Sequence, residues 1–349
     1  MQAASLEVTH RCIARCIMCN IWKIPGDVPE ISNERWLSLL SSPWFSDLRE
    51  LDVTGGEPFL KSDLFDLLAG VAELKSGNLK ALRSIAVTTN GLLPEKVIGE
   101  TEKIVRELER HDIELVVVCA MDAVGFTHER IRNFPDAWSR VDETIEGLVG
   151  LRQRHSLIIG LKTTVLPINV GELHGVAAYA EARGLFTIVS PRIITEGRYL
   201  NRDMAASLAF SPEDLRKMID FYQGEPFHWS YHREMLLKYF KGGVAKKPCA
   251  CGFNYLFVRS NGDVYPCPLL GACAGNVNDE KLENIFRSET AKRILKKAGR
   301  FPQCRTCTEP GLERYALPSE GFSYLLLLLK TGGTKFFEAH RHMGLNKYF

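Results

Sequence analysis

The chain of 349 residues is too long for one hydrophobic core of ordinary size and indicates about two domains. Its hydrophobic content of 45% and charged content of 25% are typical of a globular protein, and its formal charge of +2 excludes a strongly basic surface for nucleic acid. No run approaches the roughly 18 consecutive apolar residues that a bilayer-spanning helix needs.

The ten cysteines predict metal or redox chemistry rather than disulfides. The first residues, MQAASLEVTH, lack the basic start and apolar region of a secretory signal, so we expect a cytoplasmic, reducing location. The cysteines form one group within residues 12–19 and another within residues 249–307, with Cys119 between them. This distribution predicts two metal sites.

Short apolar runs alternate with longer amphipathic stretches from residue 4 to about residue 224. The runs predict six strands, at Ser5–Thr9, Leu48–Val53, Leu82–Thr88, Glu114–Ala120, Leu157–Val165 and Phe186–Ser190. Helical patterns lie between them, for example at Pro94–His111, Ala137–Arg154 and Val170–Arg183. Six βα repeats with strands rich in Val and Ile predict a parallel sheet, either open or closed into a barrel.

Polar or glycine-rich residues follow the first five predicted strands. In chain order these are Cys12 to Cys19, Gly55-Gly56-Glu57-Pro58, Thr89-Asn90-Gly91, Asp122 and Pro167-Ile168-Asn169. Chemistry gathered at the carboxyl ends of parallel strands is the arrangement found in βα barrels. We therefore expect one site at this end of the sheet.

The character of the sequence changes near Gly242-Gly243. Beyond it a cysteine-rich segment contains a predicted hairpin, Leu256–Arg259 and Val264–Tyr265, joined by Ser260-Asn261-Gly262-Asp263. The predicted division is therefore a core at 1–224, a connecting helix or linker at 225–245, a small cysteine domain at 246–315 and a C-terminal helical tail at 316–349.

The spacing of Cys12, Cys16 and Cys19 leaves a metal site one ligand short. A structural zinc site brings cysteines in pairs and closes a tetrahedron, but no fourth ligand follows these three closely. An iron–sulfur cluster tolerates the gap, because its fourth iron can bind a substrate or cofactor. Three buried thiols or a zinc knuckle remain the simpler alternatives.

The pattern C-x3-C-x2-C resembles the signature of the radical S-adenosylmethionine (SAM) superfamily. The resemblance implies a partial (β/α)6 TIM-like barrel in which these cysteines hold a [4Fe-4S] cluster whose open iron chelates SAM. It further implies that the reduced cluster splits SAM into methionine and a 5′-deoxyadenosyl radical, which takes a hydrogen atom from the substrate. The missing ligand would then be the cosubstrate.

Further motifs extend the resemblance, and two positions depart from it. The implied SAM contacts are Gly55, Gly56, Glu57 and Pro58 of a GGEP loop, Thr89 and Asn90 of a TNG element, Asp122 after the fourth strand and Thr163 on the fifth. Glu57 would supply a countercharge to the methionine ammonium, and the glycines would let backbone approach it closely. Met18 replaces an aromatic residue, which leaves Trp22 to cover the adenine, and Ala120 replaces a serine. His128, Arg130 and Arg132 are either SAM or substrate contacts or solvated loop charges.

The C-terminal cysteines resemble the SPASM pattern. Twelve residues separate Cys249 from Gly262, four separate Gly262 from Cys267, and Cys304-x2-Cys307 completes the set. Because no cysteine follows Cys307, the likeness is to the shortened twitch form, which implies one auxiliary [4Fe-4S] cluster ligated by Cys249, Cys267, Cys304 and Cys307. Cys251 is an alternative to Cys249, and a zinc ribbon is the alternative for the whole segment.

Three cysteines remain outside these sets. Cys119, Cys251 and Cys273 are either inert buried thiols or, for Cys251 and Cys273, donors that return a hydrogen atom to a substrate radical. A second cluster would accept the electron that converts hydrogen abstraction into a two-electron oxidation.

The expected reaction is oxidation or epimerisation of a hydroxyl-bearing carbon in a small molecule. Peptide-maturing relatives carry a leader-recognition region ahead of the barrel, whereas Cys12 lies near the first residue here, which favours a small substrate. Peptide maturation with a separate leader-recognition protein is the alternative. An external electron donor of flavodoxin or ferredoxin type is expected, and no nucleic acid.

The residues after Gly321 combine four cationic side chains with aromatic ones. They predict a C-terminal helix packed on the barrel, or else contact with an anionic membrane surface and a lipid-linked substrate. The oligomeric state is not predicted.

Overall fold

Six parallel strands form the framework of the protein, as the alternating pattern predicts. The computed structural model describes residues 1–224, 231–244, 249–309 and 329. The strands are β1 (Ala3–Thr9), β2 (Glu50–Gly55), β3 (Ser84–Thr89), β4 (Glu114–Ala120), β5 (Leu157–Val165) and β6 (Phe186–Pro191). They pair in chain order, which confirms the partial-barrel topology.

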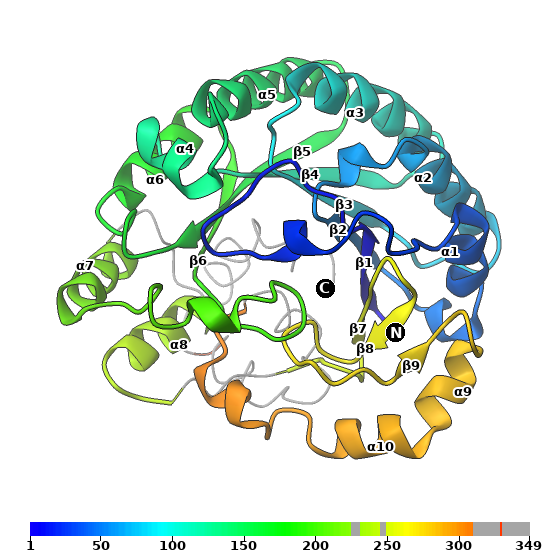
Figure 1. The fold of residues 1–349 in the computed structure, drawn as a ribbon. Coiled ribbons are helices and arrows are strands. Elements are labelled where there is room, and N and C mark those ends of the chain that lie inside the picture. Colours follow the sequence, from blue (N-terminus) through cyan, green and yellow to red (C-terminus); the bar gives the residue numbers. More distant parts are fainter. Residues whose placement is uncertain (225–230, 245–248, 310–328, 330–349) are drawn as a thin grey trace.

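Helices cover the outer face of the curved sheet (Figure 1). They are α1 (Asn33–Leu40), α2 (Leu64–Glu73), α3 (Pro94–Glu109), α4 (Phe126–Arg132), α5 (Ala137–Arg152) and α6 (Leu173–Ala182). Alternate strand residues such as Leu51, Val53 and Val117 pack against these helices in the main hydrophobic core, while their neighbours point into the barrel. A smaller cluster joins β6 to α7 (Pro212–Gln223) and α8 (Tyr231–Phe240).

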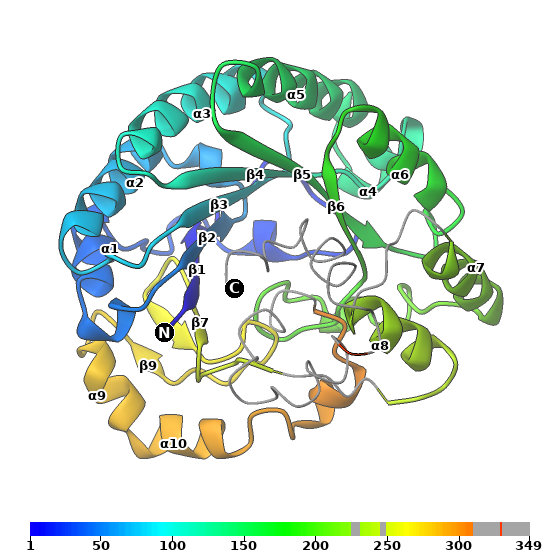
Figure 2. The same cartoon turned by 180° about the vertical axis from the view of Figure 1, so that it is seen from behind.

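The predicted hairpin extends the same sheet. Its strands β7 (Tyr255–Val258) and β8 (Asp263–Tyr265) are antiparallel, and β7 pairs in parallel with β1, with Leu6 opposite Val258. Strand β9 (Gly275–Asn276), α9 (Leu282–Arg287) and α10 (Glu289–Lys296) follow, so the sheet has the order β6-β5-β4-β3-β2-β1-β7-β8-β9 (Figure 2). The cysteine-rich segment is thus joined to the barrel edge through β1.

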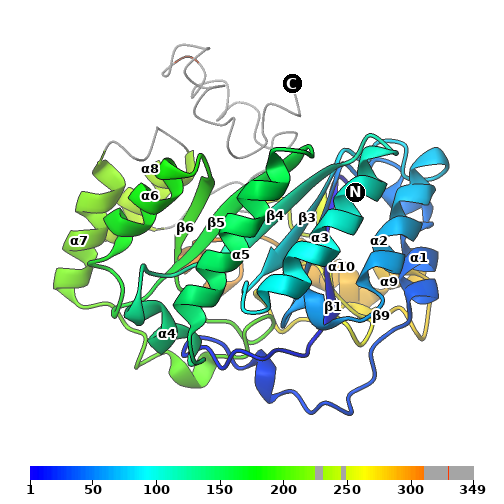
Figure 3. The ribbon, with the colours of Figure 1, turned by 90° about the horizontal axis from the view of Figure 1, so that it is seen from above.

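Short 3-10 helices connect these elements. They are Ile21–Lys23, Pro43–Phe45, Pro58–Leu60, Leu74–Ser76, Arg202–Met204 and Pro302–Thr306. The loop after β1 runs along the end of the sheet where α4 also lies (Figure 3), so the residues that follow several strands gather there.

Part of the predicted division can be placed. Helix α8 lies within the predicted connecting segment 225–245. The predicted tail at 316–349 lies outside the described residues, apart from Leu329, as does the end of the predicted cysteine domain after Glu309. Within the described ranges, no helix has the length and apolarity needed to cross a bilayer.

Candidate active site

The three N-terminal cysteines lie in one loop that borders an open cavity. Two backbone hydrogen bonds tie the loop to α4, from Arg15 N to Arg132 O (3.1 Å) and from Ile17 N to Ile131 O (2.9 Å). A third joins Asn20 N to Tyr199 O (2.8 Å), in the loop after β6. Elements far apart in the sequence therefore fix the positions of Cys12, Cys16 and Cys19.

The environment of these thiols fits an iron–sulfur ligand set. Burial, and then the neighbouring Cys16, raises the pKa of Cys12 and of Cys19 to about 12. Bound iron stabilises the thiolate form, so it would reverse this shift. In the described ranges, no three His, Cys, Asp or Glu side chains converge as the ligands of a single metal ion do. The three residues supply thiols alone, which suits a cluster with one open iron.

The GGEP glycines lie against the end of β1. A Cβ on Gly56 would lie 2.2 Å from the carbonyl oxygen of Arg11, and one on Gly55 would lie 2.4 Å from that of Thr9. The cysteine loop approaches these positions so closely that only glycine fits. This requirement is separate from the predicted contact with the methionine ammonium of SAM.

Glu57 links this loop to the end of β3. Its fully buried carboxylate accepts hydrogen bonds from Thr89 Oγ1 (2.8 Å), Asn90 N (2.7 Å) and Phe59 N (3.2 Å). Burial raises its pKa to about 7, although these hydrogen bonds oppose the shift. Glu57 and Pro58 do not border the cavity, whereas Gly55, Gly56, Thr89 and Asn90 do.

Asn90 connects β3 to the cysteine loop. Its side-chain nitrogen lies 3.8 Å from Cys12 Sγ, and its side-chain oxygen accepts a hydrogen bond from Leu92 N at 2.9 Å. The amide is therefore oriented toward a predicted cluster ligand. The predicted TNG element thus supports the thiols as well as the cavity wall.

Asp122 holds an arginine rather than facing the cavity. Its carboxylate forms a buried ion pair with Arg132 (2.7 Å) and accepts a hydrogen bond from Thr164 N (2.9 Å). Arg132 borders the cavity and approaches Cys16 Sγ at 3.8 Å. Of the other two predicted candidates, Arg130 is exposed and His128 accepts a hydrogen bond from Asp122 N (3.1 Å). Burial lowers the pKa of His128 to about 2, which keeps its ring neutral.

The fifth strand brings the predicted Thr163 and both of its neighbours to the cavity. Thr163 borders the cavity, but its hydroxyl donates to Met121 O at 2.7 Å. Lys162 and Thr164, on either side of it, also border the cavity and are partly exposed, as is Ile158 earlier in the strand, because successive side chains point to opposite faces.

The loop after β6 supplies residues that sequence reasoning missed. Its cavity residues are Arg192, Ile193, Arg198, Tyr199 and Asn201. Asn201 donates to Met18 O (2.8 Å), and Arg198 donates to Thr54 Oγ1 (2.9 Å). Residues that follow parallel strands gather at one end of the sheet. The same reasoning applied to the sixth predicted strand would have identified these loop residues. Met18 and Trp22 border the cavity as expected, and Trp22 Nε1 donates to Cys19 O (2.9 Å).

The second group of cysteines is also brought together. The Cys251 thiol lies within hydrogen-bonding reach of Cys249 and Cys267, and these contacts together with burial raise its pKa well above the usual value. Burial, followed by the charges of Cys249 and Cys267, raises the pKa of Cys304. Cys307 N approaches Cys304 O at 3.5 Å. Both Cys249 and Cys251 therefore remain candidates for the auxiliary ligand set.

The remaining cysteines lie apart from both groups. Cys119 is fully buried among the core residues on the outer face of β4, as an inert thiol would be. Cys273 donates to Gly275 O at 3.3 Å. Neither Cys273 nor Cys251 borders the cavity in the part of the chain that the structure describes, and their role as hydrogen donors stays a prediction.

Comparison with protein families matches both halves of this arrangement. The radical SAM superfamily matches residues 6–167, and the SPASM iron–sulfur cluster-binding domain matches residues 249–308. These ranges contain both groups of cysteines. They imply a [4Fe-4S] cluster that uses SAM, and further iron–sulfur binding in the SPASM domain.

Curated relatives extend over both domains. The chain is 22% identical over 306 residues to the antilisterial bacteriocin subtilosin biosynthesis protein AlbA of Bacillus subtilis, which covers 86% of this chain and 63% of that protein. It is 24% identical over 313 residues to the AdoMet-dependent heme synthase of Methanosarcina barkeri, covering 83% of each. The chain therefore spans less than two thirds of AlbA.

Solved structures share the fold. The structure of anSMEcpe with bound AdoMet and the Cp18Cys peptide matches with a TM-score of 0.60 at 19% identity, covering 99% of this chain and 100% of that one. Streptococcus suis SuiB bound to its precursor peptide SuiA matches with a TM-score of 0.61 at 14% identity, covering 91% and 73%. With the two matched domains and the cysteine loop at the barrel end, the chain belongs to the radical SAM superfamily and carries a SPASM domain.

Proposed function

We propose that this radical SAM enzyme oxidises a residue within a peptide. The observation that carries the proposal is the similarity to AlbA, which extends over 86% of the chain. Similarity to SkfB, a sporulation killing factor maturation protein of Bacillus subtilis, covers 81% of the chain and supports the same substrate class. The comparisons thus favour the peptide alternative over the small molecule that the sequence suggested.

The chemistry divides between the two groups of cysteines. When bound at Cys12, Cys16 and Cys19, the cluster would pass one electron to SAM and so provide the 5′-deoxyadenosyl radical that removes a hydrogen atom from the peptide. Loss of one further electron and one proton would complete a two-electron oxidation. An auxiliary cluster held by the cysteines around Cys267 would accept that electron. An external electron donor would reduce the cluster at Cys12, Cys16 and Cys19.

The residues around the cavity would orient the reactants. The β1 and β2 ends, with Gly55 and Gly56 packed against the cysteine loop, form the side where SAM would lie. Met18 and Trp22 give this side an apolar surface suited to an aromatic base. The β5 and β6 side would then face the peptide. We further propose a reducing location, because the cysteine-rich segment matches an iron–sulfur cluster-binding domain rather than a disulfide framework.

A second candidate is a small-molecule substrate of tetrapyrrole type. The observation that favours it is the heme synthase similarity, which covers 83% of both chains. Oxidation or epimerisation at a hydroxyl-bearing carbon lacks comparable support. The proposed lipid-linked substrate depends on the basic and aromatic tail, which lies outside the described residues.

The test uses anaerobically reconstituted protein, dithionite and SAM, with short peptides encoded beside the gene offered as substrates. We expect 5′-deoxyadenosine to form and one peptide to lose the mass of two hydrogens, with deuterium moving from labelled peptide into 5′-deoxyadenosine. Absence of 5′-deoxyadenosine above background would reject the radical enzyme. If a porphyrin and no peptide is converted, the second candidate replaces the first.

A further inference from the structure

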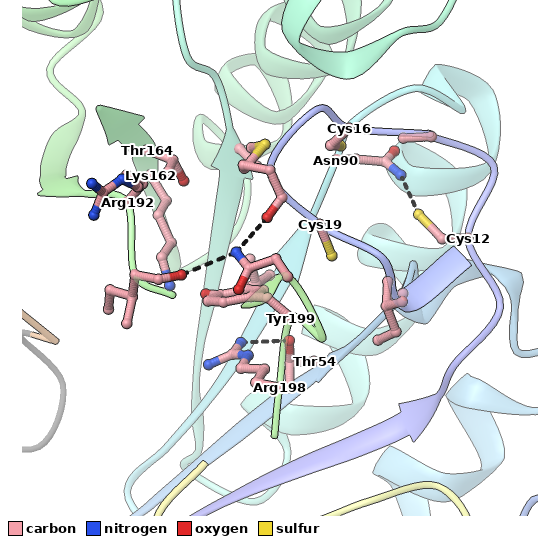
Figure 4. Close-up of a pocket in the computed structure, with 18 of the residues that line it drawn as sticks. Cys12, Cys16, Cys19, Thr54, Asn90, Lys162, Thr164, Arg192, Arg198 and Tyr199 are labelled. Carbon is pink, nitrogen blue, oxygen red and sulfur yellow. Dashed lines mark hydrogen bonds between the residues drawn. The ribbon is translucent and has the colours of Figure 1, made fainter. Parts of the chain in front are cut away.

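Two cations lie on the β5–β6 side of the cavity. Lys162 lies on β5 and Arg192 directly after β6, and both border the cavity. Among the described residues, no carboxylate lies within ion-pair distance of either side chain. Figure 4 shows them across the cavity from Cys12 and Cys16.

Arg192 is held in place without being neutralised. Its Nε donates to the backbone oxygen of Leu208, and its guanidinium lies over the ring of Phe210 at 5.0 Å. Burial lowers the pKa of Arg192, as expected for a cation without a nearby anion. The guanidinium keeps N–H donors for a further partner.

The other two cations of the cavity already have acidic neighbours. Arg132 forms its ion pair with Asp122 at 2.7 Å. Burial lowers the pKa of Arg198, but Tyr199 and Glu309 are among the groups that raise it, and the net shift is upward. The positive charge without compensation therefore lies on Lys162 and Arg192.

A buried hydroxyl lies beside these cations. Ser190 is 5% exposed and borders the cavity, and none of the residues that the structure describes forms a hydrogen bond with its Oγ. It pairs with Thr164 across β5 and β6, two residues along the strand from Lys162. An ammonium, a guanidinium and an unpaired hydroxyl form a set of donors that matches the oxygens of a carboxylate.

The cosubstrate does not supply the missing negative charge. SAM carries a sulfonium and an ammonium against one carboxylate, so its binding adds positive charge to the cavity. A cluster held by three thiolates would be anionic, but it would lie at Cys12, Cys16 and Cys19, across the cavity from Lys162 and Arg192 (Figure 4). The N–H donors of these two cations are therefore left for an anion that enters with the substrate. The charge balance therefore points to the substrate.

We propose that Lys162, Arg192 and Ser190 bind a carboxylate group of the substrate. The inference rests on the proposed function and narrows its substrate class to acidic molecules. Two sources share this chemistry, an Asp or Glu side chain of a peptide and the carboxylate of a compound that is not a peptide. The test includes both.

The experiment measures binding to the reconstituted enzyme with SAM, by anaerobic calorimetry at low salt. The probes are a short peptide containing two Glu residues, the same peptide with Gln in their place, and glutarate. We expect the Glu peptide to bind about tenfold more tightly than the Gln peptide, as a charge-assisted pair would give. Lys162→Met should reduce the preference to less than about twofold, and Lys162→Arg should keep it.

Three controls separate this role from others. The SAM dissociation constant of Lys162→Met should stay within about twofold of the wild type. Lys217→Met, on the exposed face of α7, should bind every probe as the wild type does. The visible absorbance of the clusters should be the same in all variants, which shows that the fold and metal content are retained.

Two results would overturn the proposal. One is equal binding of the Glu and Gln peptides with no binding of glutarate. The other is a large loss of SAM affinity in Lys162→Met, which would assign the lysine to the SAM carboxylate. Binding of glutarate without the Glu peptide would support the carboxylate site and identify a non-peptide substrate. Formation of 5′-deoxyadenosine and of oxidised peptide is scored separately, so failure of the carboxylate site is distinguishable from failure of the proposed function.

Discussion

At the scale of single residues, several side chains near the cavity act through their neighbours. Glu57 joins the GGEP loop to the end of β3, and Asp122 positions Arg132 beside Cys16. Both carboxylates are fully buried, and burial raises the pKa of each. A change in their protonation would therefore act on the contacts that position the GGEP loop and Arg132, and not directly on a bound reactant.

Glu57 should make stability depend on pH. Because its pKa is about 7 in the folded state against 4.5 normally, the folded state binds the proton more tightly. The stabilisation is fully present below about pH 4.5 and is lost as the pH rises through about 7. Relative to Glu57→Gln, the wild-type free energy of unfolding should fall by about 3 kcal/mol across this range.

Urea unfolding of cluster-free protein at about pH 5 and about pH 8 checks this. Glu73→Gln, at the exposed end of α2, is the matched control and should follow the wild type. Parallel pH dependence of wild type and Glu57→Gln would contradict the expectation.

Gly56 should not tolerate a methyl group. An alanine Cβ would lie 2.2 Å from Arg11 O and 2.6 Å from His10 O. Both are backbone atoms at the start of the cysteine loop. Gly56→Ala should cost about 1–3 kcal/mol of unfolding free energy and reduce the iron retained after reconstitution. Iron analysis and thermal unfolding measure both effects.

Gly99→Ala provides the contrast. Gly99 lies inside α3 with no atom within 4 Å of its added Cβ, so alanine there should stabilise the protein by about 0.5–1 kcal/mol. If Gly56→Ala behaved in the same way with full iron content, the loop would have more freedom than its contacts indicate.

At the scale of elements, the predicted strands and hairpin are present, with ends shifted by a few residues. The pattern of Leu48–Val53 became β2 at Glu50–Gly55, so Thr54 and Gly55 belong to the strand itself. Apolar residues predict a strand, but hydrogen bonding with its neighbours sets its ends. On β5, successive side chains alternate between the two faces of the sheet, so Thr163 points to the opposite face from Lys162 and Thr164. Which face is which depends on the register with the neighbouring strands, and the sequence does not give that register.

The junction of β7 with β1 depends on an ion pair. Arg259 binds Glu7 through Nε to Oε1 and Nη2 to Oε2, each at 3.2 Å, and Glu7 is 2% exposed. Arg259→Met would leave a buried carboxylate without its partner, so it should cost about 3–5 kcal/mol. Urea unfolding measures this, and limited proteolysis should show faster cleavage in the hairpin.

An exposed pair serves as the comparison. Arg106 and Glu102 lie one turn apart on α3, 2.5 Å from each other, and Arg106→Met should cost less than about 0.5 kcal/mol. The double variant Glu7→Gln with Arg259→Met should recover part of the stability. Equal costs for Arg106→Met and Arg259→Met would mean that solvent reaches Glu7.

At the scale of the whole molecule, one loop contacts both groups of cysteines. Tyr199 O accepts from Asn20 N in the first cysteine loop, while Arg198 N donates to Pro268 O (2.9 Å), next to Cys267. Gly197 permits the second approach, since its Cβ would lie 2.6 Å from Pro268 O. The cavity and the auxiliary cysteines are therefore neighbours through residues 197–199.

Removal of an auxiliary cluster ligand should separate SAM cleavage from product formation. Cys304→Ala should retain about half of the iron and still cleave SAM, but should form no oxidised product, because no acceptor remains for the second electron. Cys16→Ala should abolish SAM cleavage. Iron analysis and quantitation of 5′-deoxyadenosine measure these outcomes.

Cys119→Ala is the control for removal of a thiol, because Cys119 lies in the core on the outer face of β4. It should keep its full iron content and turnover. Unchanged iron and product formation in Cys304→Ala would remove Cys304 from the ligand set.

The sequence by itself determined the barrel repeats, the two groups of cysteines and the superfamily, because these depend on local patterns and on ligand spacing. Tertiary structure decided that Glu57 and Asp122 turn away from the cavity, that β7 joins β1, and that Lys162 and Arg192 have no acidic partner within the described ranges. The physical reason is that burial, strand register and charge compensation depend on residues brought together from distant segments. The local sequence around a residue does not specify which distant residues will become its neighbours.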